Sequence, residues 1–163
     1  MIRLEGSCRC GAVSFAVDSH APVPYQRCYC SICRKTAGSG GYAINLSAVA
    51  DTLAVKDRSA IGTFHAEIAG PDGDTTTGSA ERSFCTRCGT PLWVYDPTWP
   101  ELLHPFASAI DTPLPRAPAT THLLLADKPD WAQVEVGPND LVFDGFPEES
   151  IEDWHRRHSL WLD

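Results

Sequence analysis

The sequence predicts a mainly β protein with a short helix near its C-terminal end, arranged as one domain over residues 1–163. Apolar side chains alternate with small or polar ones in many short segments, which is the period of a half-buried strand. Thirteen prolines and twelve glycines place turns between these segments. The 163 residues contain no repeat, low-complexity tract or linker, and this length suits one domain with its own core.

The clearest predicted strand covers residues 11–18, where Val13, Phe15 and Val17 alternate with small or polar residues. The glycine-rich segment 69–78 is typical of a hairpin loop. Further strands are predicted at residues 42–46, 52–55, 61–68, 79–85, 91–95, 102–110 and 121–126. Residues 113–120 are expected to be irregular, because the three prolines there cannot donate to a strand ladder.

One helix is predicted within residues 147–163. Pro147 suits its first turn, and Glu148 and Glu149 suit the positive end of the helix dipole. One face of this helix would carry Ile151, Trp154, His158 and Trp161. A shorter helical turn is expected at residues 31–38.

Charge and hydropathy narrow the classes of partner. The formal net charge is -8, whereas nucleic-acid binding needs a basic face. The basic pairs at 34–35 and 156–157 are small enough to be solvated surface. No apolar run is long enough to span a membrane. We therefore expect neither nucleic acid nor membrane as a partner.

Seven cysteines fall into three clusters: Cys8 with Cys10, Cys28 with Cys30 and Cys33, and Cys85 with Cys88. The start of the chain lacks the pattern of a signal peptide, so we expect a cytoplasmic protein. Thiols stay reduced there, which makes a disulfide framework improbable. Metal binding is the better interpretation of this spacing.

The first and third clusters predict a closed structural zinc site. Side chains two apart in an extended segment share a face, so Cys8 and Cys10 can bind one ion. Cys85 and Cys88 can do the same from a turn, with Gly89 supplying the positive φ that such a turn needs. Zinc prefers four ligands in a tetrahedron. The competing interpretation is that these cysteines are buried as small apolar residues.

The middle cluster predicts a different kind of site. Cys28, Cys30 and Cys33 supply three thiolates, which leaves one tetrahedral position open, as in catalytic zinc sites. A four-cysteine site and a three-cysteine site together would use all seven cysteines and hold two zinc ions. The alternative is a fourth protein ligand, which would make this site structural as well. The candidates are His20, His65, His104, His122, His155 and His158, none with an evident ligand spacing.

The segments GSCRCGAVSF, CYCSICRKTAGS and SFCTRCGTPLW resemble the glutathione-dependent formaldehyde-activating enzyme and centromere protein V family. DKPDW and VFDGFPEE are similar to its C-terminal part. The resemblance implies a β-tent of antiparallel sheets with a structural zinc on Cys8, Cys10, Cys85 and Cys88 and a catalytic zinc on Cys28, Cys30 and Cys33. It also implies a carbon–sulfur lyase that adds formaldehyde to glutathione. This chain departs from the family at Tyr29, where many members carry histidine, and in a longer turn at 70–78.

Three thiolates make zinc a weak Lewis acid but a good partner for a fourth thiolate, which is the nucleophilic form of a thiol. We therefore expect a glutathione-like thiol to be activated for addition to a small aldehyde, or for its release. Arg34 and Lys35 would attract its carboxylates, with Thr36 or Ser39 orienting them. The competing interpretation is that Arg34 and Lys35 are solvated surface residues. Pocket walls are expected from among Tyr42, Trp93, Tyr95 and Trp99, although core packing competes for these aromatics.

Two other functions compete with this enzyme. One is a binding module in which both zinc ions are structural. The other is a redox or metal sensor that uses the middle cluster. The fourth ligand of the second zinc separates the three, because a substrate thiol favours the enzyme and a protein ligand favours the module.

Overall fold

The structure is a computed structural model that describes residues 1–70 and 72–163. Within these residues the strands form three sheets, with two short α-helices between and beside them. The predicted mainly β fold class is confirmed. No helix in the described part of the chain is long and apolar enough to cross a membrane.

The first sheet is built on the N-terminal hairpin. β1 (Ile2–Ser7) pairs antiparallel with β2 (Ser14–Ser19), and β2 pairs with β6 (Ala54–Val55). The alternation predicted for residues 11–18 is confirmed, because the buried side chains are those of Val13, Phe15 and Val17.

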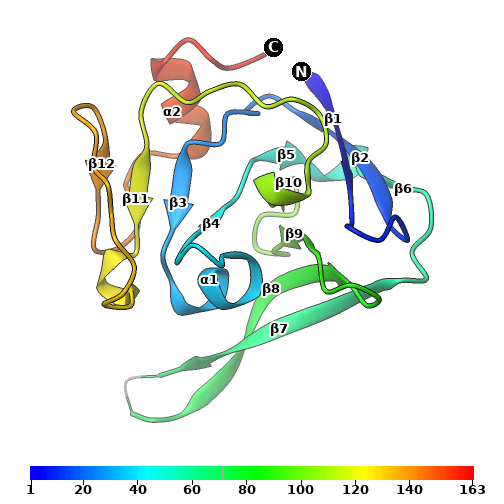
Figure 1. Ribbon diagram of the computed structural model, residues 1–163, viewed down its shortest axis with the longest axis horizontal. Helices are drawn as coiled ribbons and strands as arrows, with labels where there is room; N and C mark the ends of the chain where they lie inside the picture. The colour runs from blue at the N-terminus through cyan, green and yellow to red at the C-terminus, as the bar shows by residue number, and fades with distance from the viewer. Residues whose placement is uncertain (71) are drawn as a thin grey trace.

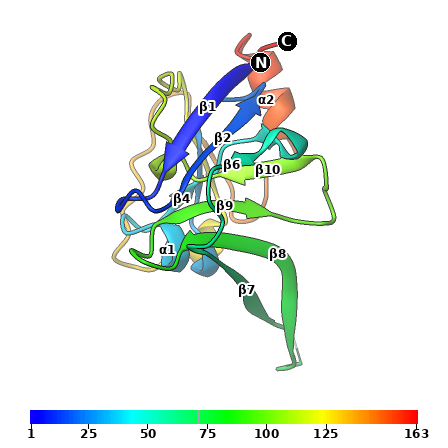
Figure 2. The same cartoon turned by 90° about the vertical axis from the view of Figure 1, so that its right-hand side faces the viewer.

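The second sheet is antiparallel and has the order β5-β10-β9-β8-β7. Its strands are β5 (Ala48–Val49), β7 (Ile61–Ala69), β8 (Thr75–Cys85), β9 (Pro91–Tyr95) and β10 (Leu102–Pro105). The long β7–β8 hairpin extends away from the body of the protein (Figures 1 and 2). The predicted hairpin loop is shorter than 69–78, since β8 already begins at Thr75. Pro71 in this loop lies outside the described residues.

The third sheet has the order β12-β11-β3-β4 and is mixed. Its strands are β3 (Gln26–Cys28), β4 (Ala43–Ile44), β11 (Thr121–Leu123) and β12 (Leu141–Val142). β11 runs parallel to both β3 and β12, whereas β4 is antiparallel to β3. The antiparallel pairing expected for the sheets is found in the first two, whereas this sheet is mixed. Parallel neighbours need long connections, and here β3 and β11 are separated by most of the chain.

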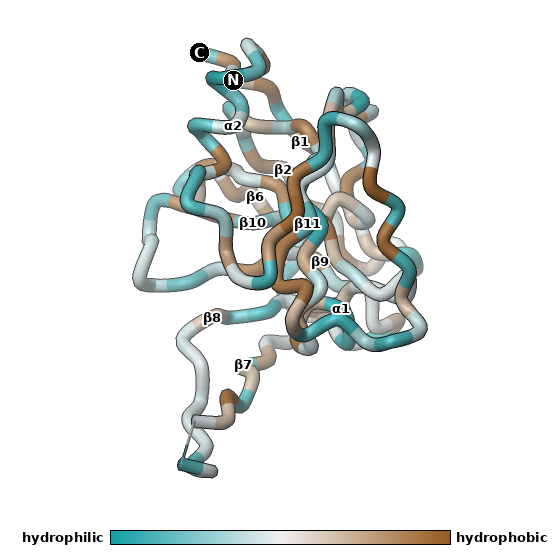
Figure 3. Tube along the Cα trace, turned by 90° about the vertical axis from the view of Figure 1, so that its left-hand side faces the viewer, coloured by the Kyte–Doolittle hydropathy of each residue, from teal (hydrophilic) through white to brown (hydrophobic). Residues whose placement is uncertain are grey.

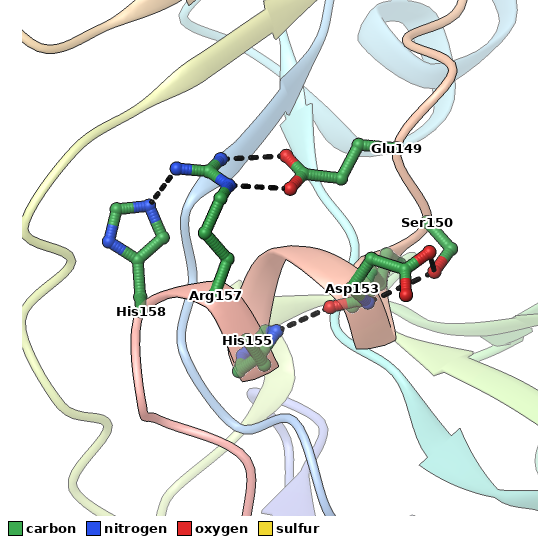
Figure 4. Close-up of polar contacts among 7 residues, drawn as sticks. Glu149, Ser150, Asp153, His155, Arg157 and His158 are labelled. Carbon is green, nitrogen blue, oxygen red and sulfur yellow. Dashed lines mark hydrogen bonds and ion pairs between the residues drawn. The ribbon is translucent and has the colours of Figure 1, made fainter.

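Both predicted helices are present. α1 (Ser31–Ala37) follows the middle cysteines, and α2 (Ile151–Arg157) lies near the C-terminal end. α2 begins later than predicted, because Ser150 caps it by accepting a hydrogen bond from the Asp153 amide at 3.0 Å. The placement of Pro147 in the first turn is wrong. Arg157 instead ties α2 back to Glu149 through two hydrogen bonds of 2.6 and 2.7 Å (Figure 4).

The core has three apolar clusters. The largest lies between the first two sheets and contains Phe15 and Trp93. A second surrounds Cys28 and Cys33 with the following side chains: Ala43, Val94, Phe106 and Leu123. The third packs α2 on the segment before β3, through a stack of Trp154 on Tyr25. Figure 3 shows an apolar stretch where β11 ends, at residues 123–126, whereas the tip of the β7–β8 hairpin is hydrophilic.

Candidate metal centres

The first and third cysteine clusters come together as predicted. The sulfur atoms of Cys8, Cys10, Cys85 and Cys88 all lie within 4.8 Å of one another. Cys8 and Cys10 lie between β1 and β2, whereas Cys85 ends β8 and Cys88 lies in the turn between β8 and β9. The cluster therefore joins the first sheet to the second.

In both turns a glycine with positive φ directly follows the second cysteine. Gly11 follows Cys10 with φ of 76°, and Gly89 follows Cys88 with φ of 73°, as expected for Gly89. The Gly11 amide donates to the Cys8 carbonyl at 3.0 Å, and the Gly89 amide to the Cys85 carbonyl at 2.8 Å. The extended course predicted for Cys8–Cys10 is wrong, because β1 ends at Ser7 and the chain then turns.

This geometry fits zinc. Zinc–sulfur bonds of about 2.3 Å in a tetrahedron place the sulfurs about 3.8 Å apart. The Cys8 and Cys10 sulfurs are 3.5 Å apart, and those of Cys10 and Cys85 are 3.8 Å apart. All seven cysteines are free thiols. Four sulfurs held this close without a disulfide need a cation between them once they ionise.

The middle cluster also comes together. The sulfurs of Cys28, Cys30 and Cys33 lie within 4.8 Å of one another. Cys28 ends β3, and Cys30 caps α1 by accepting a hydrogen bond from the Cys33 amide at 3.3 Å. In Figure 1, α1 lies between β4 and β8, where the second and third sheets meet. Cys28 and Cys33 are buried, and Cys30 is half-buried.

Among the described residues, no histidine or carboxylate completes the middle cluster. His122 shares a hydrogen bond with the Tyr29 hydroxyl, while His104 bonds the Leu46 carbonyl and His155 bonds the Ile151 carbonyl. The protein thus offers three donors in this cluster and four in the other.

The three thiols of the middle cluster, called the trio below, differ in their pKa values. Hydrogen bonds from Cys28 and Cys33 lower the pKa of the Cys30 thiol to about 2. Hydrogen bonds with Cys30 and Cys33, together with burial, raise the pKa of Cys28. One sulfur therefore carries charge readily, and further ionisation needs a bound cation, which is the behaviour of a metal-binding set.

Two polar side chains contact the sulfur of Cys33. The Arg82 guanidinium donates from Nη1 at 3.7 Å, and the Asn45 amide donates from Nδ2 at 3.9 Å. Arg82 comes from β8, and Asn45 follows β4. Charged and amide donors stabilise a thiolate. The pKa of Cys33 is nevertheless raised, because the hydrogen bond from Cys28, which lowers it, is outweighed by the hydrogen bond with Cys30 and by burial. Ionisation of Cys33 therefore also needs a bound cation.

The predicted substrate-binding residues lie together on another face of α1. Arg34, Lys35, Thr36 and Ser39 line an open groove of about 510 Å³ that also includes Arg9 and Thr90. Cys33 instead lines a smaller cavity of about 140 Å³. Of the predicted aromatic walls, Trp93 packs on Phe15 in the core, and Trp99 is exposed. Tyr42 lines a separate hollow behind α1.

Sequence reasoning missed the polar residues around Cys33, namely Asn45, Arg82 and His104. A signal was present, since each interrupts an otherwise apolar or alternating predicted strand. Asn45 stands in YAINL, Arg82 in SAERSFC and His104 in LLHPF. A polar side chain at an inward position of a strand requires a partner.

A mainly β fold with a four-cysteine and a three-cysteine cluster defines a protein with two candidate metal centres. The chain matches the glutathione-dependent formaldehyde-activating enzyme family over residues 3–125 and belongs to that family. The resemblance seen in the sequence is thereby confirmed.

One relative is a protein of Halomonas elongata with the provisional name glutathione-dependent formaldehyde-activating enzyme. It is 59% identical over 157 residues, which are 96% of this chain and 97% of that protein. A crystal structure of a Rhodobacter sphaeroides protein is similar with a TM-score of 0.51 and 25% identity. The match covers 68% of this chain and 91% of that one.

Proposed function

We propose that this protein is a zinc enzyme that adds a small thiol to a small aldehyde, or catalyses the reverse release. Its reaction would form or break a carbon–sulfur bond, as in a carbon–sulfur lyase. The observation that carries the proposal is the unequal pair of clusters. Cys8, Cys10, Cys85 and Cys88 offer a complete tetrahedron, whereas Cys28, Cys30 and Cys33 offer three sulfurs beside a cavity.

The four-cysteine cluster would hold a structural zinc, and the trio a catalytic one. Zinc at the trio would supply positive charge and one open coordination position, which together favour the thiolate form of a substrate. In the overall reaction the thiol sulfur bonds to the carbonyl carbon, and the thiol proton passes to the carbonyl oxygen.

A glutathione-like thiol suits the surface around α1. The name of the family supports glutathione as the thiol and formaldehyde as the aldehyde. Glutathione carries two carboxylates, and the groove beside α1 brings together three cations, those of Arg9, Arg34 and Lys35. Ser39 lies in the same groove and would orient a carboxylate by a hydrogen bond. The cytoplasmic location stays a prediction.

Cobalt substitution tests this proposal. Cobalt in a tetrahedral thiolate site has absorption bands that respond to each added sulfur, so glutathione should change the spectrum of the cobalt-loaded protein. S-methylglutathione, which keeps both carboxylates but cannot supply a thiolate, is the matched control and should leave the spectrum unchanged. Equal effects of the two compounds, or none at millimolar concentration, would refute thiol activation and favour a binding module with two structural metals.

A further inference from the structure

The cavity beside Cys33 lies where the second and third sheets meet α1 and α2. It has a volume of about 140 Å³, and Cys33 is the trio cysteine that lines it. Its apolar walls include Val94 and Ile151, and its polar walls are Gln26, Asn45, Arg82 and His104. Ile151 begins α2 and lies beyond residues 3–125, the range that matches the family.

His104 lines this cavity and has one ring nitrogen without a hydrogen-bond partner among the described residues. Its Nδ1 lies 3.0 Å from the Leu46 carbonyl oxygen, which can only accept, so Nδ1 carries the proton. In the neutral ring Nε2 is then an acceptor. Among the described residues none bonds to Nε2, and the atom is not fully buried. Burial also lowers the pKa of His104, which keeps the ring neutral.

Arg82 lines the same cavity, and also a second pocket beside Phe84 and Pro91, and has one donor without a partner among the described residues. Nη1 contacts the Cys33 sulfur, and Nε is fully buried without a partner, so packing fixes the guanidinium. Nη2 is neither fully buried nor bonded to any residue in the described part of the chain. Arg82 forms no ion pair with a described carboxylate. A fixed cationic donor of this kind suits an oxygen on which negative charge develops.

We propose that this cavity is the carbonyl subsite, in which His104 Nε2 accepts the thiol proton and Arg82 binds the carbonyl oxygen. The inference rests on the proposed function and names residues for it. The sulfur–carbon bond forms as the carbonyl π pair moves to oxygen beside Arg82. The proton held on Nε2 then passes to that oxygen, so no oxidant, reductant or other reactant is needed.

The cavity volume also sets the size of the aldehyde. At about 30 Å³ for each water in the liquid, the space corresponds to about five waters. An aldehyde of one to three carbons fits beside the sulfur-bearing end of a thiol, whereas an aromatic aldehyde does not. Val94 and Ile151 form the apolar limit, and Ile151 is the wall that can be shortened without touching the sheets.

The experiment uses the zinc-loaded full chain and measures the exchange of formaldehyde with glutathione by exchange NMR. His104→Gln and Arg82→Gln should each lower the enzymatic exchange rate at least about tenfold. His65→Gln is the matched control, because His65 Nδ1 also contacts a backbone carbonyl, that of Gly78 at 3.2 Å, but lies on the hairpin. Ile151→Ala should raise the rate for butyraldehyde relative to formaldehyde.

A second readout does not depend on turnover. Fluoroacetone, a small ketone, should show fluorine NMR broadening with the wild type and His65→Gln but not with Arg82→Gln. Normal exchange in zinc-loaded His104→Gln and Arg82→Gln would overturn the inference and leave the proposed function standing. No exchange by the wild type would overturn the proposed function and the role of His104. Fluoroacetone binding would then still decide whether the cavity takes carbonyls. If the polar variants fail to fold, an unchanged aldehyde profile in Ile151→Ala overturns the subsite.

Discussion

The Tyr29 hydroxyl lies 3.0 Å from Nδ1 of His122, and both side chains are fully buried. Beyond them, Nε2 of His122 faces the Asp140 carboxylate at 3.6 Å. Tyr29 stands between two cysteines of the trio, and its amide bonds the Leu123 carbonyl at 3.0 Å. The position of the segment that joins β3 to α1 and carries the trio therefore depends on a polar chain that reaches across β11 to the loop before β12.

Removing the hydroxyl should destabilise the protein without emptying the metal sites. Tyr29→Phe leaves the buried Nδ1 of His122 unpaired, which costs about 1–3 kcal/mol. For a chain of this size, each kcal/mol lowers Tm by roughly 2–4 °C. Thermal unfolding of the zinc-loaded variant measures this. Tyr42→Phe is the control, because the Tyr42 hydroxyl makes no hydrogen bond within the described part of the chain, and this variant should melt like the wild type. Equal Tm values for both variants would contradict the role of this chain.

The local parts of this fold were predictable from the sequence, and the long-range parts were not. The alternation of Val13, Phe15 and Val17 is a property of one strand and is readable directly. β3, β11 and β12 have three residues or fewer each and pair with partners far away in the sequence. Their parallel register follows from packing around Leu123 and Cys28, which no local pattern encodes.

The two cysteine clusters should differ in their effect on folding. Cys85→Ser removes a fully buried ligand from the cluster that joins the first two sheets. Structural zinc supplies on the order of 10 kcal/mol in small domains, comparable with the whole stability of a domain. We expect this variant to be insoluble or to melt far below the wild type.

Cys30→Ser is the matched comparison, because it removes one ligand from the trio. It should remain soluble, keep most of the wild-type Tm and lose one zinc. Solubility, Tm and zinc content, measured side by side for the two variants, show which cluster is needed for folding. An equal loss of stability would assign a structural role to the trio as well.

At Gly89 there is room for a side chain, but the positive φ of the backbone would strain any residue other than glycine. A Cβ at Gly89 would meet no atom within 4 Å, yet φ is 73°. Left-handed backbone costs an ordinary residue about 1–2 kcal/mol, so Gly89→Ala should weaken zinc binding at the four-cysteine cluster roughly 5- to 30-fold. Competition with a chromophoric chelator measures this. Gly145→Ala, with equal space and no positive φ, should bind zinc as the wild type does.

The stability of α2 should fall as the pH falls. His155 is fully buried, accepts a hydrogen bond from the Val23 amide at 3.2 Å, and has a pKa lowered by burial. The unfolded chain then binds the proton more tightly, so this stability is present above pH 6.5 and is lost below it. At pH 5.5 one histidine accounts for at most about 1.4 kcal/mol.

The free energy of unfolding at pH 7.5 and 5.5 tests this point. His155→Gln should reduce the difference between the two pH values, whereas His65→Gln on the exposed hairpin should keep the wild-type difference. Comparing variants removes the effect of acid on zinc binding, which is common to all of them. A wild-type pH difference in His155→Gln would exclude this histidine as a source.

For the candidate site, as for the fold, the local features could be predicted from the sequence and the long-range contacts could not. The seven cysteines could be sorted into four and three, because ligand spacing is a short-range property and the total left no remainder. Arg82 could not be assigned to Cys33, since β8 and α1 meet only through the packing of two sheets. The start of α2 was missed although Ser150 and Asp153 carry a capping signature, because Pro147 offered an earlier start.

We propose that the chain holds one zinc on four cysteines and a second zinc on the other three. Native mass spectrometry of the reduced protein, purified without chelators, tests it most directly. We predict a mass of the folded chain plus two zinc ions, with one zinc lost first when a weak chelator is added. A folded, reduced chain that carries no zinc would contradict the claim.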